Sequence, residues 1–473
     1  MNQIDIDGRL IEAINRGDCV AFVGAGFSAA AGIPQWRELL RQLVDQMGDA
    51  RQAPEVESVR ALIADDKPVT SRELEMAAQL LYDAVGAERF SERLNVALQQ
   101  EAIPEPMAKR RDHLLGIPFR AIVTTNFDLL LPGQPPSGRA FRSLLRNPRP
   151  SPWREAAIRI ALRRESVNDA PAADDLPPKA DTPVVQLHGN VGDPTSLVMT
   201  RSQYRRRLYA DRAYLTVLRS LLATSRVLFL GYSLTDAYLN ELRSELIEAF
   251  SDNPFGTAAR AGAHPGFGDE PLAWAVLDNV SEVAAQYYRR HEGLGVIAYD
   301  SGPDRTDHSG FDAILKDLYD QTNPIHRLGS RLNNKRILWL DPHPDNNDVG
   351  RQLIRAAVED CSSGREHFAH QLYEVTEFES ALTRLASDGP SFDLVISHWG
   401  YDTVANSATA VNLLQRIAQL RAEGRAVGPV VIFASGGEHE AHNRSVALRF
   451  GAAAYETRWG ALMVTIERLL PES

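Results

Sequence analysis

CVAFVGAGFS at residues 19–28 sets the architecture that the rest of the chain follows. An apolar, valine-containing run that ends in glycine is typical of a buried parallel strand that turns directly into a helix. Glycines in such a turn let backbone N–H groups approach a pyrophosphate, and a helix that starts there adds its positive end. Ala29 takes the third position of the G-x-G-x-x-G pattern. Dinucleotide binding and a tight turn without a ligand are therefore both open.

Further apolar runs end in turn residues in the same way: FRAIVTTNFD at 119–128, PVVQLHG at 183–189 and RVLFLGYS at 226–233. GLGVIAYD at 293–300 supplies a last strand, and amphipathic stretches such as SRELEMAAQLLYDAV at 71–85 lie between the runs. Strands that alternate with helices are typical of a parallel sheet covered by crossover helices. The sequence therefore predicts a parallel α/β fold.

The alternation of strands and helices stops and then begins again, which predicts two domains. We expect the first domain at 1–325, with an insertion around 132–182 where proline and polar residues are dense. A polar linker at 326–335 follows, and RILWLD then opens a second, smaller α/β domain at 336–473.

The composition is that of a globular protein without a nucleic-acid signature. The 473 residues are 44% apolar and 24% charged, and 51 Lys and Arg stand against 62 Asp and Glu, a formal net charge of −11. Because there is no general basic field, we expect no specific nucleic-acid partner and no membrane partner. No signal peptide is evident, and no apolar run approaches the roughly 18 residues of a membrane span. The two cysteines, Cys19 and Cys361, form no disulfide framework, which favours a reducing cytoplasm.

Polar side chains follow several predicted strands, at the ends where open α/β sheets bind ligands. Asn126 and Asp128 can hydrogen-bond a ribose edge or a water, or they can form an Asx turn that caps a following DLLL helix. His188 is either a catalytic imidazole or a structural histidine with satisfied hydrogen bonds. Ser233, shortly after Gly231, offers a hydroxyl to phosphate or ribose.

The order of the motifs, GAGFS with GIP, then TTNFD, then LHG, then GYSL, resembles the Rossmann-like NAD-binding core of the sirtuin family. It is most similar to the bacterial sirtuin-like branch found in antiviral defence proteins, over roughly residues 10–325. The resemblance implies that Asn126 and Asp128 hold the nicotinamide end of NAD and that His188 is the catalytic histidine. The residues that it assigns to NAD binding are Gly24, Ala25, Gly26, Phe27, Ser28, Arg37, Thr125, Gly231 and Ser233.

Departures from the family bear on the substrate. Protein-deacylating sirtuins carry a four-cysteine zinc ribbon after the histidine, whereas this chain has no cysteine between Cys19 and Cys361, so we expect no zinc. The aspartate of the family's GIPDFR segment is Gln35 here, and the peptide groove has no evident counterpart. The defence members of this family that share the pattern are NAD glycohydrolases, and the resemblance implies the same activity for this chain. NAD+ is thus the implied substrate, and a protein deacylase is the less favoured hypothesis.

Residues 336–473 resemble the receiver domain of response regulators, which implies a flavodoxin-like fold. Only Asp341 stands in the acidic first loop, and His398 takes the phosphoacceptor position. Ser435 fits the switch hydroxyl, but Arg458 replaces the lysine. Phosphorylation chemistry needs two acidic metal ligands, an acceptor aspartate and a lysine.

We therefore expect a degenerate receiver that binds a partner or a second copy of the chain. The alternative is that Asp345, Asp348 or His398 supports some metal or phosphate chemistry.

The leading hypothesis is a cytoplasmic effector that cleaves NAD+ to nicotinamide and ADP-ribose in antiphage defence. His188 would take a proton from water or a ribose hydroxyl, Asn126 would orient that group, and Asp128 would lie near the nicotinamide carboxamide. Because an unregulated NADase would kill its host, we expect control through a homo-oligomer or an activating protein partner on the C-terminal domain. The alternative from another class is a non-catalytic sensor of NAD or ADP-ribose.

Overall fold

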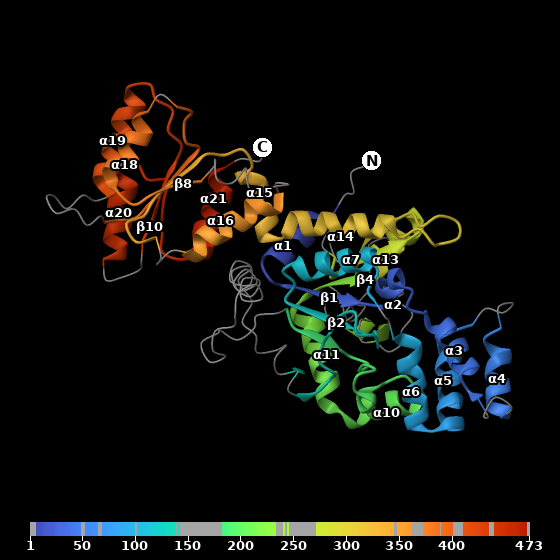
Figure 1. Cartoon of the computed structure of the whole chain (residues 1–473). Helices are drawn as coiled ribbons and strands as arrows, with labels where there is room; N and C mark the ends of the chain where they lie inside the picture. Colours follow the sequence, from blue (N-terminus) through green and yellow to red (C-terminus); the bar gives the residue numbers. More distant parts are fainter. Residues whose placement is uncertain are drawn as a thin grey trace, which may run out of the picture. The chain divides into compact units, whose positions relative to one another are not determined.

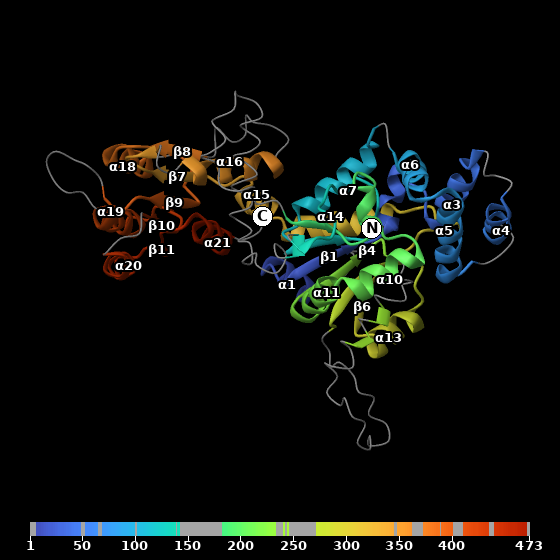
Figure 2. The same cartoon turned by 90° about the horizontal axis from the view of Figure 1, so that it is seen from below.

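The computed structural model describes residues 6–48, 53–64, 69–99, 102–138, 140–141, 182–232, 240–241, 244–245, 271–344, 348–361, 372–387, 389–400, 410–434 and 439–470. Within these ranges the chain forms two compact units, one from 6–141 with 182–319 and one from 320–470. Each unit is a parallel sheet with helices beside it (Figures 1 and 2). The prediction of an α/β protein with two parallel sheets is confirmed.

The sheet of the first unit has six strands in the order β3-β2-β1-β4-β5-β6. They are β1 (Cys19–Val23), β2 (Ala121–Thr124), β3 (Val184–Gln186), β4 (Arg226–Leu230), β5 (Ala273–Asp278) and β6 (Leu294–Tyr299). β1 lies centrally and pairs in parallel with β2 on one side and with β4 on the other. The strand order therefore reverses between β1 and β4, where doubly wound sheets bind ligands.

Both faces of this sheet are covered, which explains why β1 is an unbroken apolar run. Cys19, Ala21 and Val23 pack into one core, and Val20 and Phe22 pack into the core on the opposite face. The first core receives α1 (Gly8–Asn15), α7 (Glu105–Gly116) and α14 (Ser309–Thr322), and the second receives α11 (Arg212–Thr224). Figure 1 shows α7 and α14 on one side of the strands and α11 on the other.

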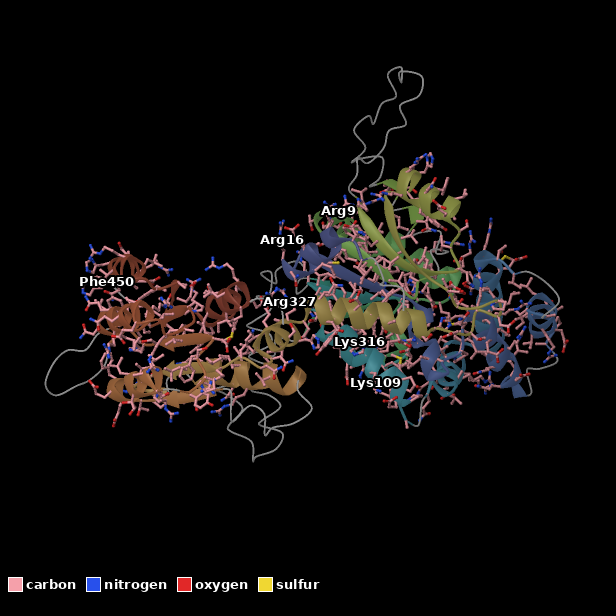
Figure 3. The ribbon with its side chains drawn as sticks, turned by 90° about the horizontal axis from the view of Figure 1, so that it is seen from above. Arg9, Arg16, Lys109, Lys316, Arg327 and Phe450 are labelled. Atoms are coloured by element: carbon pink, nitrogen blue, oxygen red, sulfur yellow. The ribbon has the colours of Figure 1, made fainter. Side chains whose placement is uncertain are left out.

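Charged side chains mark the outward faces of the covering helices. Lys109 on α7 and Lys316 on α14 are exposed to solvent (Figure 3). α13 (Glu282–His291) joins β5 to β6 and has no fully buried residue. These helices therefore bury one stripe and leave the other in water, as amphipathic crossover helices do.

After β1 the chain forms the short helix α2 (Ala25–Ser28) and the 3₁₀ turn η1 (Ala29–Ala31), and a layer of helices comes next. It consists of α3 (Trp36–Asp45), α4 (Pro54–Leu62), α5 (Ser71–Val85) and α6 (Ala87–Leu98). A capping box between Thr70 and Glu73 starts α5, and Gly86, with φ of 81°, separates α5 from α6. After β3 come the 3₁₀ turn η3 (Pro194–Ser196) and α10 (Arg201–Ala210).

The second unit has a five-stranded parallel sheet in the order β11-β10-β9-β7-β8. Its strands are β7 (Ile337–Leu340), β8 (Leu372–Val375), β9 (Leu394–Ser397), β10 (Val430–Phe433) and β11 (Ala454–Glu456). Its helices are α16 (Asp348–Cys361), α18 (Phe378–Ala386), α19 (Ala410–Ala422), α20 (Glu440–Arg449) and α21 (Trp459–Leu469). Read from β8, this is the 2-1-3-4-5 order of flavodoxin-like folds.

Helix α15 (Pro324–Leu332) occupies most of the segment that the sequence predicts as a linker. Leu328 and Leu332 are buried in a core of the second unit. Arg327 on α15 donates to Glu467 on α21, with 3.0 Å between Nη2 and Oε2. α15 is therefore part of the second unit, although the domain boundaries at 325 and 336 stay predictions.

The predicted insertion around 132–182 lies for the most part, at 142–181, outside the described residues. Among the helices that the structure does describe, none combines the length and the apolar character that a membrane span requires.

Candidate active site

The carboxyl ends of the strands in the first unit border a cavity of about 1000 Å³. Residues from the loops after β1, β2, β3, β4, β5 and β6 contribute to its wall. The predicted site residues that line it are Ala25, Gly26, Thr125, Asn126, Asp128, His188 and Gly231. Side chains from distant parts of the sequence thus meet at one place, as parallel strands require.

Asn126 is buried and held by its amide nitrogen. Nδ2 donates to the carbonyl of Gly24 at 3.1 Å and to Ser28 Oγ at 2.9 Å, and the backbone N–H donates to Thr124 Oγ1 at 3.0 Å. Oδ1 is buried and has no hydrogen-bond partner among the described residues. An unpaired buried acceptor costs about 1–3 kcal/mol. Because Asn126 lines the cavity, a donor on a bound molecule or a water can satisfy this oxygen.

Asp128, two residues after Asn126, is also buried. Its Oδ1 accepts the N–H of Leu130 at 3.0 Å, which is an Asx turn, but residues 129–131 form no helix. Burial raises the pKa of the carboxyl, against the hydrogen bonds from Ser28 and from the Leu130 N–H, which lower it. Ser28 therefore contacts both Asn126 and Asp128. A carboxyl with a raised pKa in a cavity is typical of functional sites.

His188 lies two residues after the end of β3 in the sequence. Its carbonyl accepts the N–H of Val198 at 2.8 Å, and the next residue, Gly189, has a φ of 74°. The imidazole packs near the rings of Phe127 and Tyr204, with centroid distances of 6.1 and 5.1 Å. Tyr204 Oη is 3.2 Å from Nε2 and 3.4 Å from Nδ1. His188 is therefore held by neighbours and lines the cavity at the same time.

The glycines of the β1 and β4 turns are needed because the two loops touch. Gly24 N–H donates to Leu230 O at 3.0 Å, and Gly26 N–H donates to Gly231 O at 2.9 Å. A Cβ on Gly24 would lie 2.6 Å from Gly231 O, and one on Gly231, whose φ is +60°, would lie 2.2 Å from Phe27 N. Close packing of backbone on backbone is thus one reason for this glycine pattern.

Four other predicted residues, Gly24, Phe27, Ser28 and Arg37, are not among those that line the cavity. Phe27 is fully buried and packs on Phe311, which lines the cavity, but Phe27 itself does not line it. Arg37 does not line the cavity either, since its guanidinium donates to the carbonyls of Ile63, at 3.1 Å, and Ala64 at the end of α4. Ser233 lies outside the described residues.

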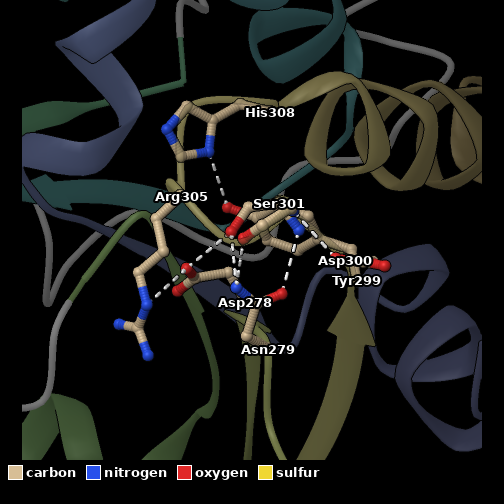
Figure 4. A network of polar contacts seen from close by, with 8 residues as sticks. Asp278, Asn279, Tyr299, Asp300, Ser301, Arg305 and His308 are labelled. Atoms are coloured by element: carbon tan, nitrogen blue, oxygen red, sulfur yellow. Dashed lines mark hydrogen bonds and ion pairs between the residues drawn. The ribbon is translucent and has the colours of Figure 1, made fainter.

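A polar network that is not among the predicted site residues lies at the ends of β5 and β6 (Figure 4). Ser301 Oγ donates to Asp278 Oδ2 at 2.9 Å, and Asn279 Nδ2 donates to Ser301 Oγ at 3.0 Å. Tyr299 Oη lies 3.0 Å from His308 Nδ1, and burial together with the nearby Asp278 charge raises the pKa of Tyr299 to about 12. Asp278, Asn279, Tyr299 and His308 line the same cavity. AWAVLDN, an apolar run that ends in two polar residues, was the signal.

In the second unit, the strand ends bring together Asp341 after β7 and His398 after β9. The His398 N–H donates to Leu340 O at 3.0 Å, and its Nδ1 lies 2.9 Å from Gly400 O. Arg458 is exposed. The residues Asp345 and Ser435, and the side chain of Asp348, lie outside what the structure describes. In the described ranges of both units, no three His, Cys, Asp or Glu side chains gather as metal ligands do.

Comparisons with known proteins find similar sequences for part of the chain. The family described as "SIR2-like domain" matches residues 120–265, which include Asn126, Asp128, His188 and Gly231. The NAD(+) hydrolase ThsA of Enterococcus faecium is 25% identical over 249 residues, 52% of this chain and 43% of the relative. The NAD(+) hydrolase ThsA of Cytobacillus dafuensis is 22% identical over 236 residues, which are 50% of this chain and 39% of that relative. The ThsA of Acinetobacter baumannii is 25% identical over 250 residues, which are 52% of this chain and 42% of that relative.

The chain thus spans less than half the length of the curated relatives that it matches. The family match at 120–265 does not reach the second unit. Within the first unit, residues 120–265 are therefore similar to the SIR2-like domain family, and the chain is distantly similar to the ThsA proteins.

Proposed function

We propose that the first unit is an NAD+ glycohydrolase that cleaves NAD+ to nicotinamide and ADP-ribose. The observation that carries this proposal is that Asn126, whose buried Oδ1 has no partner among the described residues, and His188 both line one cavity of about 1000 Å³. The volume suits a ligand of dinucleotide size. The distant similarity to proteins named NAD(+) hydrolase supports the same activity.

The reaction breaks the bond between C1′ of the ribose and the pyridinium nitrogen. Nicotinamide leaves with the bonding electron pair and becomes neutral, and positive charge develops on the ribose ring. Water then adds to C1′ and loses a proton to His188. Asn126 Oδ1 accepts a hydrogen bond from that water or from a ribose hydroxyl, while Asp128 lies near the carboxamide of nicotinamide.

The test is release of nicotinamide from NAD+ by the purified chain, with an acetylated peptide added in parallel. We expect nicotinamide without any deacetylated peptide, and we expect Asn126→Ala and His188→Ala to abolish release while the circular dichroism spectrum stays unchanged. Asn95→Ala and His291→Ala, which change exposed residues outside the cavity, serve as matched controls. Full turnover by both cavity variants would remove the assignment. Binding of ADP-ribose without turnover by the wild type would favour the sensor.

We further propose that this activity depletes NAD+ in antiphage defence and is controlled by self-association or by a protein partner that contacts the second unit. The support is the resemblance of the motifs to defence proteins and the need to restrain an enzyme that consumes a central metabolite. Cellular NAD+ should fall only after infection in cells that produce the chain. Constant depletion in uninfected cells that survive would contradict the control.

A further inference from the structure

Tyr204 reaches the His188 ring from a helix whose start is firmly fixed. Thr200 and Gln203 form a capping box at the first turn of α10. Gln203 Oε1 accepts the backbone N–H groups of Met199 and Thr200, each at 2.9 Å. The N–H of Ser202 donates to Gln79 Oε1 on α5 at 3.0 Å. The position of Tyr204, one turn into the helix, is thus set by contacts that do not involve the cavity.

The Tyr204 ring contributes both packing and a hydroxyl. It meets His188 edge to face, at an interplanar angle of 74°, while Phe127 lies across the imidazole at 32°. Two aromatic neighbours limit rotation of the imidazole. The hydroxyl lies within hydrogen-bond distance of both ring nitrogens, 3.2 Å from Nε2 and 3.4 Å from Nδ1. One phenol can therefore serve the ring in either tautomer.

We propose that Tyr204 is a positioning residue that holds the His188 imidazole at the angle needed to accept a proton at the ribose. This proposal rests on the proposed function, in which His188 is the base. A phenol hydroxyl donates to an unprotonated nitrogen and accepts from a protonated one, so it can remain bonded while the ring takes up a proton. Once the ring is charged, the same hydrogen bond becomes charge-assisted and about twice as strong.

Whether loss of the Tyr204 hydroxyl changes kcat or KM depends on the state in which its hydrogen bond to His188 is stronger. A contact that is stronger in the transition state than in the ground state contributes to kcat, whereas a contact of equal strength in both changes KM. Tyr204→Phe keeps the ring packing and removes only the hydroxyl. We therefore expect kcat for nicotinamide release to fall by about 10- to 100-fold, with KM for NAD+ changed by less than about 3-fold.

Tyr82→Phe is the matched control, because Tyr82 also packs against an aromatic ring, that of Phe90, and does not line the cavity. It should keep the wild-type kcat and KM. A Tyr204→Phe enzyme with wild-type kcat would overturn the proposal, and so would a variant that raises KM and leaves kcat unchanged.

A spectroscopic measurement separates this proposal from the proposed function. Nitrogen-15 NMR of labelled histidine at about pH 9, where imidazoles are neutral, reports the tautomer populations and hydrogen bonds of His188. Its signal is assigned by its loss in His188→Gln. We expect the signal to move in Tyr204→Phe and to stay in place in Tyr82→Phe, even if the wild type releases no nicotinamide. An unmoved signal in Tyr204→Phe would disprove the contact, whereas an inactive wild type with a moved signal would disprove only the proposed function.

Discussion

At the scale of single residues, the site depends on a short chain of buried hydrogen bonds through Ser28. This serine accepts from Asn126 Nδ2 and bonds to the carboxyl of Asp128, so it orients two proposed functional side chains together. Buried polar groups stabilise a protein only when their partners are present. The acceptor left over is Asn126 Oδ1, which is buried without a partner among the described residues, on a residue that lines the cavity.

The buried Asp128 makes the stability of the first unit depend on pH. Its pKa is raised, chiefly by burial, so folding favours the protonated form. The resulting stabilisation is complete below about pH 4 and is lost as pH rises through the folded-state pKa. Asp128→Asn has no charge to bury, so its melting temperature should exceed that of the wild type at pH 7, with a gap that narrows towards pH 4.

Thermal unfolding at several pH values checks this expectation. Asp112→Asn, which changes an exposed carboxyl on α7, should leave the pH dependence unchanged. A gap between Asp128→Asn and the wild type that widens as pH falls would show that the sign is wrong.

Residue patterns predict strand-end side chains well and long-range partners poorly. Asn126, Asp128 and His188 each lie within a few residues of the end of a buried strand, so the parallel sheet places them at one edge. Arg37 sits on α3, and where its long side chain goes depends on the carbonyls at the end of α4, which no local pattern of the sequence indicates. Tyr204 was missed for the same reason, because its partner depends on how α10 packs.

At the scale of elements, α7 and α14 are joined by a buried arginine that also supports the β1 turn. Arg110 is 2% exposed, and its Nε and Nη2 donate to the two carboxylate oxygens of Asp312 at 2.6 and 2.9 Å. Its Nη1 donates to the carbonyl of Phe27 at 2.9 Å. The guanidinium also lies 4.9 Å from the ring centroid of Phe311. Arg110 therefore holds the turn after β1, which borders the cavity, to α7 and α14.

Removal of this guanidinium should cost much of the stability of the first unit. Breaking a fully buried pair costs about 3–5 kcal/mol, and because Asp312 is partly exposed we expect Arg110→Leu to lower the free energy of unfolding by about 2–3 kcal/mol. Urea titration gives the value. Arg111→Leu on the adjacent, more exposed position should change it by less than about 0.5 kcal/mol. Equal effects of the two substitutions would mean that the Arg110 contacts do not stabilise the unit.

Elements with a buried apolar run were predictable, whereas others depended on tertiary contacts. The β8 sequence LYEV lies at the edge of its sheet, and Tyr373 and Glu374 there are not buried, so it lacks the continuous apolar character of β7 or β9. α15 contains a glycine and several polar residues and reads as a linker, yet Leu328 and Leu332, one turn apart, give it a buried stripe. β5 had a clear apolar signal that the sequence analysis did not use.

At the scale of the whole molecule, each unit has its own sheet and its own cores. Cores on the two faces of the first sheet and on the two faces of the second contain separate sets of residues. Units with independent cores can unfold in separate steps, so one melting temperature does not describe such a chain. The cavity with Asn126 and His188 belongs entirely to the first unit.

Ligand binding should therefore stabilise one unit and not the other. We expect two calorimetric transitions, one for each unit. ADP-ribose at 100 times its dissociation constant should stabilise the first unit by about 2.7 kcal/mol and so raise the temperature of its transition. Leu394→Ala, in the core of the second unit, should lower the other transition and leave the ligand-sensitive one in place. A ligand that raises both transitions equally would contradict this assignment.

The division of the cavity wall among six strand ends has an evolutionary consequence. Each end supplies only a few side chains, and the intervening sequence has only to form a helix that covers the sheet. Homologues can thus diverge or acquire insertions between these points without loss of the pocket. We expect them to retain short islands of identity at a shared order, so a search that scores the islands will reach relatives that whole-chain identity misses.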